Sequence, residues 1–437
     1  MEQIDDLISA RWVIPIEPHG TVLEDHSVAI RDGRIVAVLP NNEAQKRFHA
    51  RTTQQFSEHA LMPGLVNAHT HVAMNLFRGI ADDLRLMDWL SNHIWPAEGK
   101  WVNYDFVRDG TELAIAELLR GGVTCFNDMY FFPDETARVA AQYSMRAQVG
   151  MILIDFPTVW AKDADEYLHK GLELHDNYRN HPFIRTCFAP HAPYTVSDAP
   201  LSRVRTLSEE LDVPIHMHIH ETADEVNQSV AQFGMRPLQR LDQLELLSPR
   251  MLAVHMTQLT DAEIERFGAT GGHVIHCPES NLKLASGFSP VAKLLNAGVN
   301  VALGTDGTAS NNDLDMFGEM RTAALLAKAC ASDASAIPAA TALQMATLNG
   351  AKALGLDEEI GSLLPGKSAD LIAVDLGQLE SQPLYNPLSH LVYCTHRQNV
   401  TDVWIGGKQL LKNRQLTHMD EAELIDKAKA WRRKIAG

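Results

Sequence analysis

Eight short apolar segments recur through the middle of the chain, and this repetition constrains the fold more than any other feature. Stretches with the spacing of amphipathic helices separate them, such as Phe106 to Arg120, which stops at Gly121 and Gly122. Strands that alternate with helices in this way are typical of a (β/α)₈ barrel, a TIM-like α/β fold. The expected barrel strands are Leu61–Val66, Val123–Asn127, Ala147–Ile152, Ile184–Ala189, Pro214–Ile219, Met251–Val254, His273–His276 and Val299–Leu303.

A doubly wound open sheet is the alternative arrangement for such a pattern. That fold is favoured when a G-x-G-x-x-G turn follows a strand, and no expected strand is followed by one. We therefore expect the barrel.

The two ends of the chain have a different pattern, with short strands and tight turns. A D-G turn at residues 32–33 and a G-G turn at residues 406–407 each lie between apolar runs and predict β-hairpins. A helix is expected from about Asp420 to Lys434. The expected domains are residues 1–60 with 366–437, a composite β-sandwich domain with a C-terminal helix, and residues 61–365, the barrel.

Charge and cysteine content limit the partners of this chain. It has 38 Lys and Arg against 55 Asp and Glu, a net charge of −17, which disfavours binding to nucleic acid or to an anionic membrane surface. No apolar run is long enough to cross a membrane, and the acidic first residues lack the pattern of a signal peptide. Five scattered cysteines without a C-x-x-C pair predict reduced thiols in a cytoplasmic protein, and the apolar content permits a homo-oligomer.

Histidine and aspartate recur at the ends of the expected strands. Active sites of barrels lie at the carboxyl ends of the strands, and packing alone does not explain such a repeated pattern. The residues at these ends are His69 and His71, His191, His216, His218 and His220 with Glu221, His255, His276 and Asp306.

His69 and His71 are two residues apart, so on an extended strand they point to the same side. Alone, such a pair is more often structural, but here its potential partners lie at the ends of other strands. Several imidazoles and a carboxylate at one end of a barrel predict a zinc site with an open position, and the same donors also suit Fe²⁺ or Mn²⁺.

The remaining strand-end residues suggest roles beside a metal. His216, His218 and His220 alternate onto one face, so periodicity alone does not choose the ligand. Glu221 could act as a proton shuttle, and His255 as a ligand or as a base that orients water. Asp306 could bind the metal and also accept a proton. The structural alternatives are an exposed acid, a buried histidine and a simple D-G turn.

Together these motifs resemble the amidohydrolase superfamily, whose metal-dependent barrels carry a β-domain made from both termini. The resemblance rests on residues 63–71 (PGLVNAHTH), His218-x-x-Glu221, His255 and residues 304–306 (GTD). It implies one metal ion per subunit, since residues 188–193 lack the lysine that bridges two metals in the binuclear branch. It also implies these roles: metal ligands His69, His71, His218 and Asp306, proton shuttle Glu221, and His255 to steer the hydroxide.

Within this superfamily the chain is similar to the 5′-methylthioadenosine/S-adenosylhomocysteine deaminases. Residues 89–98, 189–194, 280–287 and 304–315 carry the similarity. It implies a nucleoside substrate whose ribose diol contacts Glu98 and whose nucleoside contacts His191. The expected reaction is hydrolysis of the 6-amino group of an adenine nucleoside to the inosine analogue and ammonia.

One departure from the family bears on the substrate. Family members that accept S-adenosylhomocysteine hold its carboxylate with arginines, and there is no arginine between Arg146 and Arg179. The apolar segment Met151 to Trp160 suits a methylthio group, so we expect 5′-methylthioadenosine to be preferred, with S-adenosylhomocysteine or adenosine also possible. The alternatives are a deaminase or chlorohydrolase of another heterocycle (guanine, cytosine or a triazine) and a non-catalytic, zinc-stabilised scaffold.

Overall fold

The computed structural model describes residues 1–437, which fold around two eight-stranded sheets. The chain divides into two compact units, residues 1–67, 116–125 and 315–420 in one, and residues 68–115, 126–314 and 421–437 in the other. The domain boundaries expected from the sequence, at residues 60 and 365, stay a prediction.

One sheet is the barrel, in which strands β5 to β12 follow one another in chain order. The neighbouring pairs from β7 to β12 run parallel. Past the end of β12 the backbone N–H of Asp306 donates to the carbonyl of His69 in β5 at 3.0 Å, so the last strand meets the first. This confirms the barrel and excludes the open sheet. The strands are β5 (Leu65–Thr70), β6 (Val123–Asp128), β7 (Arg146–Leu153), β8 (Ile184–Pro190), β9 (Ile215–Ile219), β10 (Met251–His255), β11 (His273–His276) and β12 (Asn300–Leu303).

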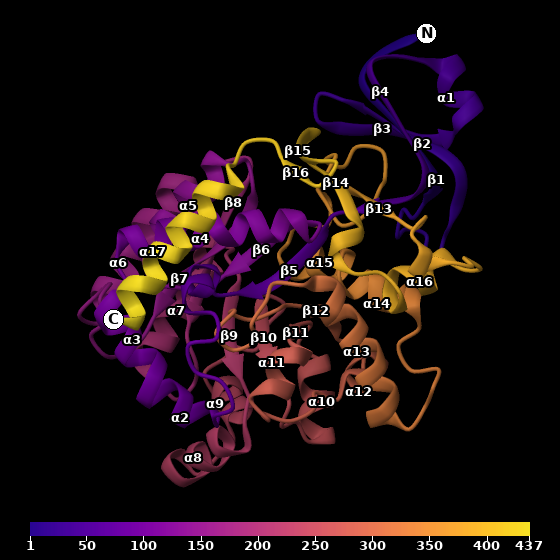
Figure 1. Ribbon diagram of the computed structural model, residues 1–437. Coiled ribbons are helices and arrows are strands. Elements are labelled where there is room, and N and C mark those ends of the chain that lie inside the picture. The colour runs from indigo at the N-terminus through magenta and orange to yellow at the C-terminus, as the bar shows by residue number, and fades with distance from the viewer. The chain divides into compact units, whose positions relative to one another are not determined.

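Helices connect successive barrel strands and lie outside them (Figure 1). Several begin at the residue types that favour a helix start: the side chain of Asp163 accepts the N–H of Glu166, and Thr222 and Thr260 cap their helices in the same way. The helices are η1 (Val72–Phe77), α2 (Leu86–Trp89), η2 (Leu90–Ile94), α3 (Trp95–Trp101), α4 (Tyr104–Arg120), α5 (Pro133–Gln142), α6 (Ala164–Tyr178), α7 (Asp198–Leu211), α8 (Ala223–Phe233), α9 (Pro237–Gln243), α10 (Asp261–Gly268), α11 (Pro278–Lys283) and α12 (Val291–Asn296).

The first barrel strand differs from its predicted bounds. The prediction Leu61–Val66 is wrong, since residues up to Pro63 continue β4 and pair with β13. The exchange of partners occurs at Gly64, whose N–H donates to the carbonyl of Asp370, while the N–H of Leu65 donates to the carbonyl of Gly122 beside β6. Both halves are apolar because both strands are buried, so hydrophobicity does not mark the break.

The second sheet combines both ends of the chain, in the order β16-β15-β14-β13-β4-β1-β2-β3. Both predicted hairpins are confirmed: Arg31 pairs with Arg34, and Ile405 pairs with Lys408. The two turns have positive φ at both central residues, as such two-residue turns require. The elements of this unit are β1 (Glu2–Val13), β2 (Leu23–Arg31), β3 (Arg34–Pro40), α1 (Asn41–Arg47), β4 (Phe48–Pro63), α13 (Met316–Ala331), α14 (Ala339–Met345), α15 (Leu348–Ala353), β13 (Leu371–Asp375), η3 (Leu379–Ser381), α16 (Pro387–Tyr393), η4 (Arg397–Asn399), β14 (Val400–Ile405), β15 (Lys408–Lys412) and β16 (Gln415–Leu416).

The C-terminal helix α17 (Glu421–Ala436) confirms the helix expected there and lies beside α4 (Figure 1). Lys427 Nζ is 2.8 Å from Glu112 Oε2, and the indole N–H of Trp431 donates to Asp109 Oδ2 at 2.8 Å. These contacts attach the end of the chain to α4.

No helix combines the length and the apolar character needed to cross a bilayer. All five cysteines are free thiols.

Candidate metal centre

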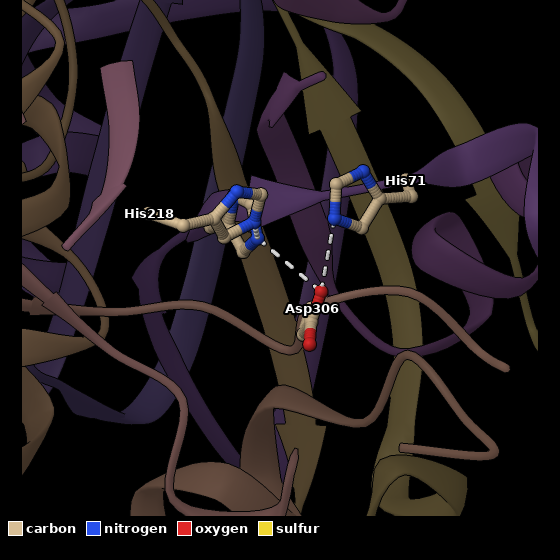
Figure 2. Close-up of side chains that lie close together, drawn as sticks. His71, His218 and Asp306 are labelled. Atoms are coloured by element: carbon tan, nitrogen blue, oxygen red, sulfur yellow. Dashed lines mark hydrogen bonds and ion pairs between the residues drawn. The ribbon is translucent and has the colours of Figure 1, made fainter. Parts of the chain in front are cut away.

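Three histidines and one aspartate converge at the carboxyl ends of the barrel strands. His69 lies near the end of β5, His71 follows that strand, His218 lies in β9, and Asp306 follows β12. Figure 2 shows the rings of His71 and His218 on either side of the Asp306 carboxylate. One donor atom from each of the four side chains lies within 4.8 Å of the others.

The separations between these atoms match the ligands of a single ion. Asp306 Oδ1 lies 3.2 Å from His69 Nε2 and 3.1 Å from His71 Nε2. His69 Nε2 lies 3.2 Å from His218 Nε2. Ligands about 2.0–2.1 Å from a tetrahedral zinc ion are about 3.3 Å apart, close to these three separations, so the four side chains are placed to share one metal ion.

The hydrogen bonds of the rings assign the lone pairs that a metal needs. His218 Nδ1 lies 2.8 Å from the carbonyl of His191, and His71 Nδ1 bonds to the carbonyl of Met129. A carbonyl only accepts, so in both rings Nδ1 carries a proton and Nε2 is the nitrogen that faces the centre of the group. Burial would lower the pKa of His71, but Asp306 outweighs it and raises that pKa to about 9, so without a metal a proton lies between His71 Nε2 and Asp306. A metal ion would replace that proton and leave a lone pair on each Nε2. Lone pairs and a carboxylate that converge on one point repel one another unless a cation lies there. The donor set therefore supports a divalent metal ion.

Asp306 is held rigidly for this role. Its Oδ2 accepts from the hydroxyls of Ser280 and Ser310, both at 2.7 Å, and its Oδ1 accepts the N–H of Gly307 at 2.8 Å. Burial would raise the pKa of Asp306, but hydrogen bonds from His69 and His71 outweigh it and hold that pKa well below its usual range. The carboxylate is therefore ionised and immobile.

Glu221 and His255 lie next to the metal group. Glu221 Oε1 is 3.8 Å from His255 Nε2. Burial, together with the charge of Asp306, raises the pKa of Glu221 to about 8. Burial lowers the pKa of His255, whose Nδ1 lies 2.8 Å from Asn281 Oδ1. A protonated acid and a neutral, oriented imidazole thus stand beside the metal group at neutral pH.

A cavity of about 250 Å³ opens over these residues. Burial raises the pKa of Glu98 in its wall to about 7, and burial lowers the pKa of His191 to about 3. The rest of the wall is mainly aromatic and aliphatic, and it contains no lysine or arginine. Its large side chains include Trp89, Trp95, Tyr130, Phe156 and Tyr194.

The structure brings all the site residues expected from the sequence to this one place. Seven of the eight line the cavity, and the eighth, His69, is fully buried in the metal group. The other two histidines of this segment have different contacts. The Nε2 of His216 lies 2.8 Å from His69 Nδ1, and the Nε2 of His220 accepts the N–H of Leu238.

Sequence reasoning missed the supporting residues. Ser280, Asn281 and Ser310 orient Asp306 and His255, and Trp89 and Tyr130 line the wall beside Glu98. Ser280 and Asn281 belong to a segment that carried the family resemblance, but nothing in their spacing signals what they contact.

Comparison with known proteins agrees with this geometry. The model of the amidohydrolase family matches residues 60–410. The 5-methylthioadenosine/S-adenosylhomocysteine deaminase of Saccharophagus degradans is 51% identical over 431 residues, which are 99% of this chain and 97% of the relative. The protein of the same name from Teredinibacter turnerae is 50% identical and covers 99% of this chain and 98% of its own length.

Solved structures extend the comparison to three dimensions. An adenosine deaminase from Xanthomonas campestris with bound zinc has a TM-score of 0.99 at 58% identity, with 100% of this chain and 99% of that chain covered. The zinc complex of atrazine chlorohydrolase from Arthrobacter aurescens has a TM-score of 0.91 at 23% identity, covers 98% and 99% of the two chains, and shows the shared fold alone. The chain therefore belongs to the amidohydrolase family of metal-dependent hydrolases, and within it to the family of the 5-methylthioadenosine/S-adenosylhomocysteine deaminases.

Proposed function

We propose that this protein is a zinc-dependent deaminase that hydrolyses the 6-amino group of adenine nucleosides, with 5′-methylthioadenosine preferred. The products are the corresponding inosine analogue and ammonia. The observation that carries the proposal is the buried Glu221, whose pKa burial raises to about 8, beside a four-residue metal group at the base of an apolar cavity. The names of the relatives support the same reaction class.

In this proposal His69, His71, His218 and Asp306 hold one zinc ion. Zinc in such a site acts as a Lewis acid and lowers the pKa of water to about 7, so that a nucleophile is present at neutral pH. Asp306 accepts a proton from the attacking water. His255, fixed by Asn281, orients that water toward the substrate.

Glu221 supplies the acid. It donates its proton to N1 of the adenine ring, which makes C6 electrophilic, and water adds there as a new C–O bond forms. Glu221 then takes the proton of the added hydroxyl as the C6=O bond forms, Asp306 passes its proton to the amino group, the C6–N bond breaks, and ammonia leaves. The sum is one water consumed and one ammonia released.

Glu98 and His191 are the proposed contacts to the nucleoside. A buried carboxylate accepts hydrogen bonds from the two ribose hydroxyls, and an imidazole can meet a hydroxyl or a ring nitrogen. We expect Glu98→Ala to raise KM for 5′-methylthioadenosine at least about tenfold, as loss of hydrogen bonds to a charged group does. The same variant leaves KM for 2′,3′-dideoxyadenosine unchanged, because that nucleoside lacks both hydroxyls.

The preference for a methylthio group follows from the chemistry of the wall. Phe156, Val159 and Trp95 are apolar, and the wall has no lysine or arginine to pair with the carboxylate of S-adenosylhomocysteine. Burial of an unpaired carboxylate is costly, whereas burial of a methylthio group is favourable.

Two alternatives fit less well. The chlorohydrolase and a guanine deaminase from Escherichia coli are each only 23% identical to this chain, and neither substrate has a ribose for Glu98. A scaffold without catalysis leaves the raised pKa of Glu221 without a role.

An ammonia-release assay tests the proposal directly. Adenosine, 5′-methylthioadenosine, S-adenosylhomocysteine, guanine and cytosine are compared, and zinc, iron and manganese are measured on the same sample. We expect the highest kcat/KM for 5′-methylthioadenosine and one zinc ion per chain. A higher kcat/KM for S-adenosylhomocysteine would contradict the proposed preference for 5′-methylthioadenosine. Ammonia release from a free base alone would contradict the proposal that the substrate is a nucleoside.

The setting of the enzyme is also proposed. The acidic charge and the five free thiols support a cytoplasmic enzyme that binds no nucleic acid and no membrane, as a monomer or a homo-oligomer.

A further inference from the structure

Lys283, the last residue of α11, makes three polar contacts that the reaction does not require. Its ammonium group lies 2.7 Å from Asp82 Oδ1, donates to the carbonyl of Ala309 at 3.1 Å, and bonds to Asn312 Oδ1. An ammonium group has three protons, so all its donors are used. Its side chain is only 21% exposed. The contacts join segments that are far apart in the chain.

One end of this connection is the metal side of the site. In the same short helix, Ser280 bonds to Asp306 and Asn281 bonds to His255. Ala309 precedes Ser310, whose hydroxyl also bonds to Asp306. Lys283 is thus anchored to the elements that orient both residues.

The other end is the part of the chain that forms one wall of the cavity. Seven of the residues that line the cavity come from residues 86–99, Trp89 and Glu98 among them. This stretch consists of a four-residue α-helix, a five-residue π-helix and a seven-residue α-helix. Helices this short are not stable alone, so their position depends on contacts with the rest of the protein.

Two further contacts join the start of this wall to the loop after Asp306. Arg78 Nη1 donates to the carbonyl of Asn312 at 2.8 Å, and Asn312 Nδ2 donates to Asp82 Oδ2 at 3.4 Å. Lys283 contacts both Asp82 and Asn312, so it is the common partner of this junction.

We propose that Lys283 is a positioning residue for the nucleoside: its ammonium group ties the wall that carries Trp89 and Glu98 to the loop that follows Asp306. The cavity then keeps its shape before substrate enters, and the nucleoside does not have to order the wall on binding. The role in substrate binding rests on the proposed function, but the tie itself does not.

Kinetics test the role in binding. Lys283→Met keeps the aliphatic stem and removes the three donors. We expect KM for 5′-methylthioadenosine to rise about tenfold, as loss of hydrogen bonds to a charged group does, while kcat changes less than about twofold and the metal content stays the same. Asp82→Asn should raise KM in the same direction, and the double variant should show less than the sum of the two effects.

Hydrogen exchange tests the tie without substrate. In Lys283→Met we expect faster amide exchange in residues 79–94 and unchanged exchange in the barrel strands. Lys293→Met is the matched control, because it breaks an exposed ion pair with Asp261 and should change neither KM nor exchange.

Other results overturn the proposal. If Lys283→Met has the wild-type KM and the wild-type rate of amide exchange, Lys283 does not position the wall. If the variant loses metal while KM is unchanged, Lys283 supports Asp306 instead. If no nucleoside releases ammonia, the proposed function fails, and hydrogen exchange alone then decides whether Lys283 holds the wall.

Discussion

At the scale of single residues, Glu221 is the strongest test of the chemistry. Glu221→Gln keeps the shape of the side chain but removes the acid that protonates the base. We expect kcat to fall by about 10²–10⁴ with the metal content unchanged, which is the usual contribution of a general acid. Steady-state kinetics and metal analysis on one sample provide the measurement.

A second buried carboxylate serves as the control for that variant. Glu112 pairs with Lys427 and does not line the cavity, so Glu112→Gln should leave kcat near the wild-type value. Near-normal turnover in Glu221→Gln would exclude its role as the acid, and loss of metal would make it a structural residue.

The raised pKa of Glu221 also predicts the pH dependence. The active form is the protonated carboxyl group, and its pKa is about 8, so kcat should be level near pH 7. Above pH 8 the group loses its proton, and kcat should fall about tenfold per pH unit. A pH–rate profile from 6 to 10 measures this decline, and a profile that stays level to pH 10 contradicts it.

The sequence predicted the site residues because their chemical types are unusual at strand ends, but it did not choose among the histidines of β9. The two-residue alternation of a strand places His216, His218 and His220 on the same face, so each is an equal candidate for the metal ligand. The structure distinguishes them by their contacts and backbone conformation. His216 contacts His69 Nδ1, and His220 lies just after the end of β9 with a φ of 54°. Such differences depend on where the strand ends in three dimensions, which spacing does not contain.

At the scale of elements, buried strands and tight turns were the predictable parts. The strand β11, His273–His276, agrees with its prediction, and the D-G and G-G hairpins form where the turn residues require. The change from β4 to β5 at Gly64 was not predictable, because a continuous apolar run carries no mark of its pairing partner. The π-helix η2 was not predictable either, since no residue type or spacing in Leu90–Ile94 marks such a turn.

The helix α17 supports a prediction about stability. Trp431 is buried at 5% exposure, bonds to Asp109 and packs against Phe106, with the ring centroids 5.2 Å apart. Trp431→Ala should lower the free energy of unfolding by about 3–5 kcal/mol, as large-to-small substitutions in a core do. Urea denaturation measures the change. Arg432→Ala, at an exposed position on the same helix, should alter stability by less than about 0.5 kcal/mol, and equal effects of the two would contradict the packing argument.

At the scale of the whole molecule, the site exists only when the barrel is closed. The candidate ligands come from both ends of the barrel sheet, β5 and the loop after β12, and from β9 between them. In the unfolded chain His71 and Asp306 are separated by more than 200 residues, so a metal that binds all four ligands binds the folded state alone. Binding and folding are therefore linked.

That linkage predicts a dependence of stability on zinc. The folded state gains RT ln(1 + [Zn]/Kd), which is about 4 kcal/mol when free zinc is a thousand times Kd. Removal of the metal by a chelator should abolish ammonia release and lower Tm, and added zinc should restore both. Thermal unfolding at several buffered zinc concentrations measures the slope. Asp306→Asn removes the only anionic ligand, so its Tm should depend much less on the zinc concentration. A wild-type Tm that does not respond to zinc would contradict the linkage between metal binding and folding.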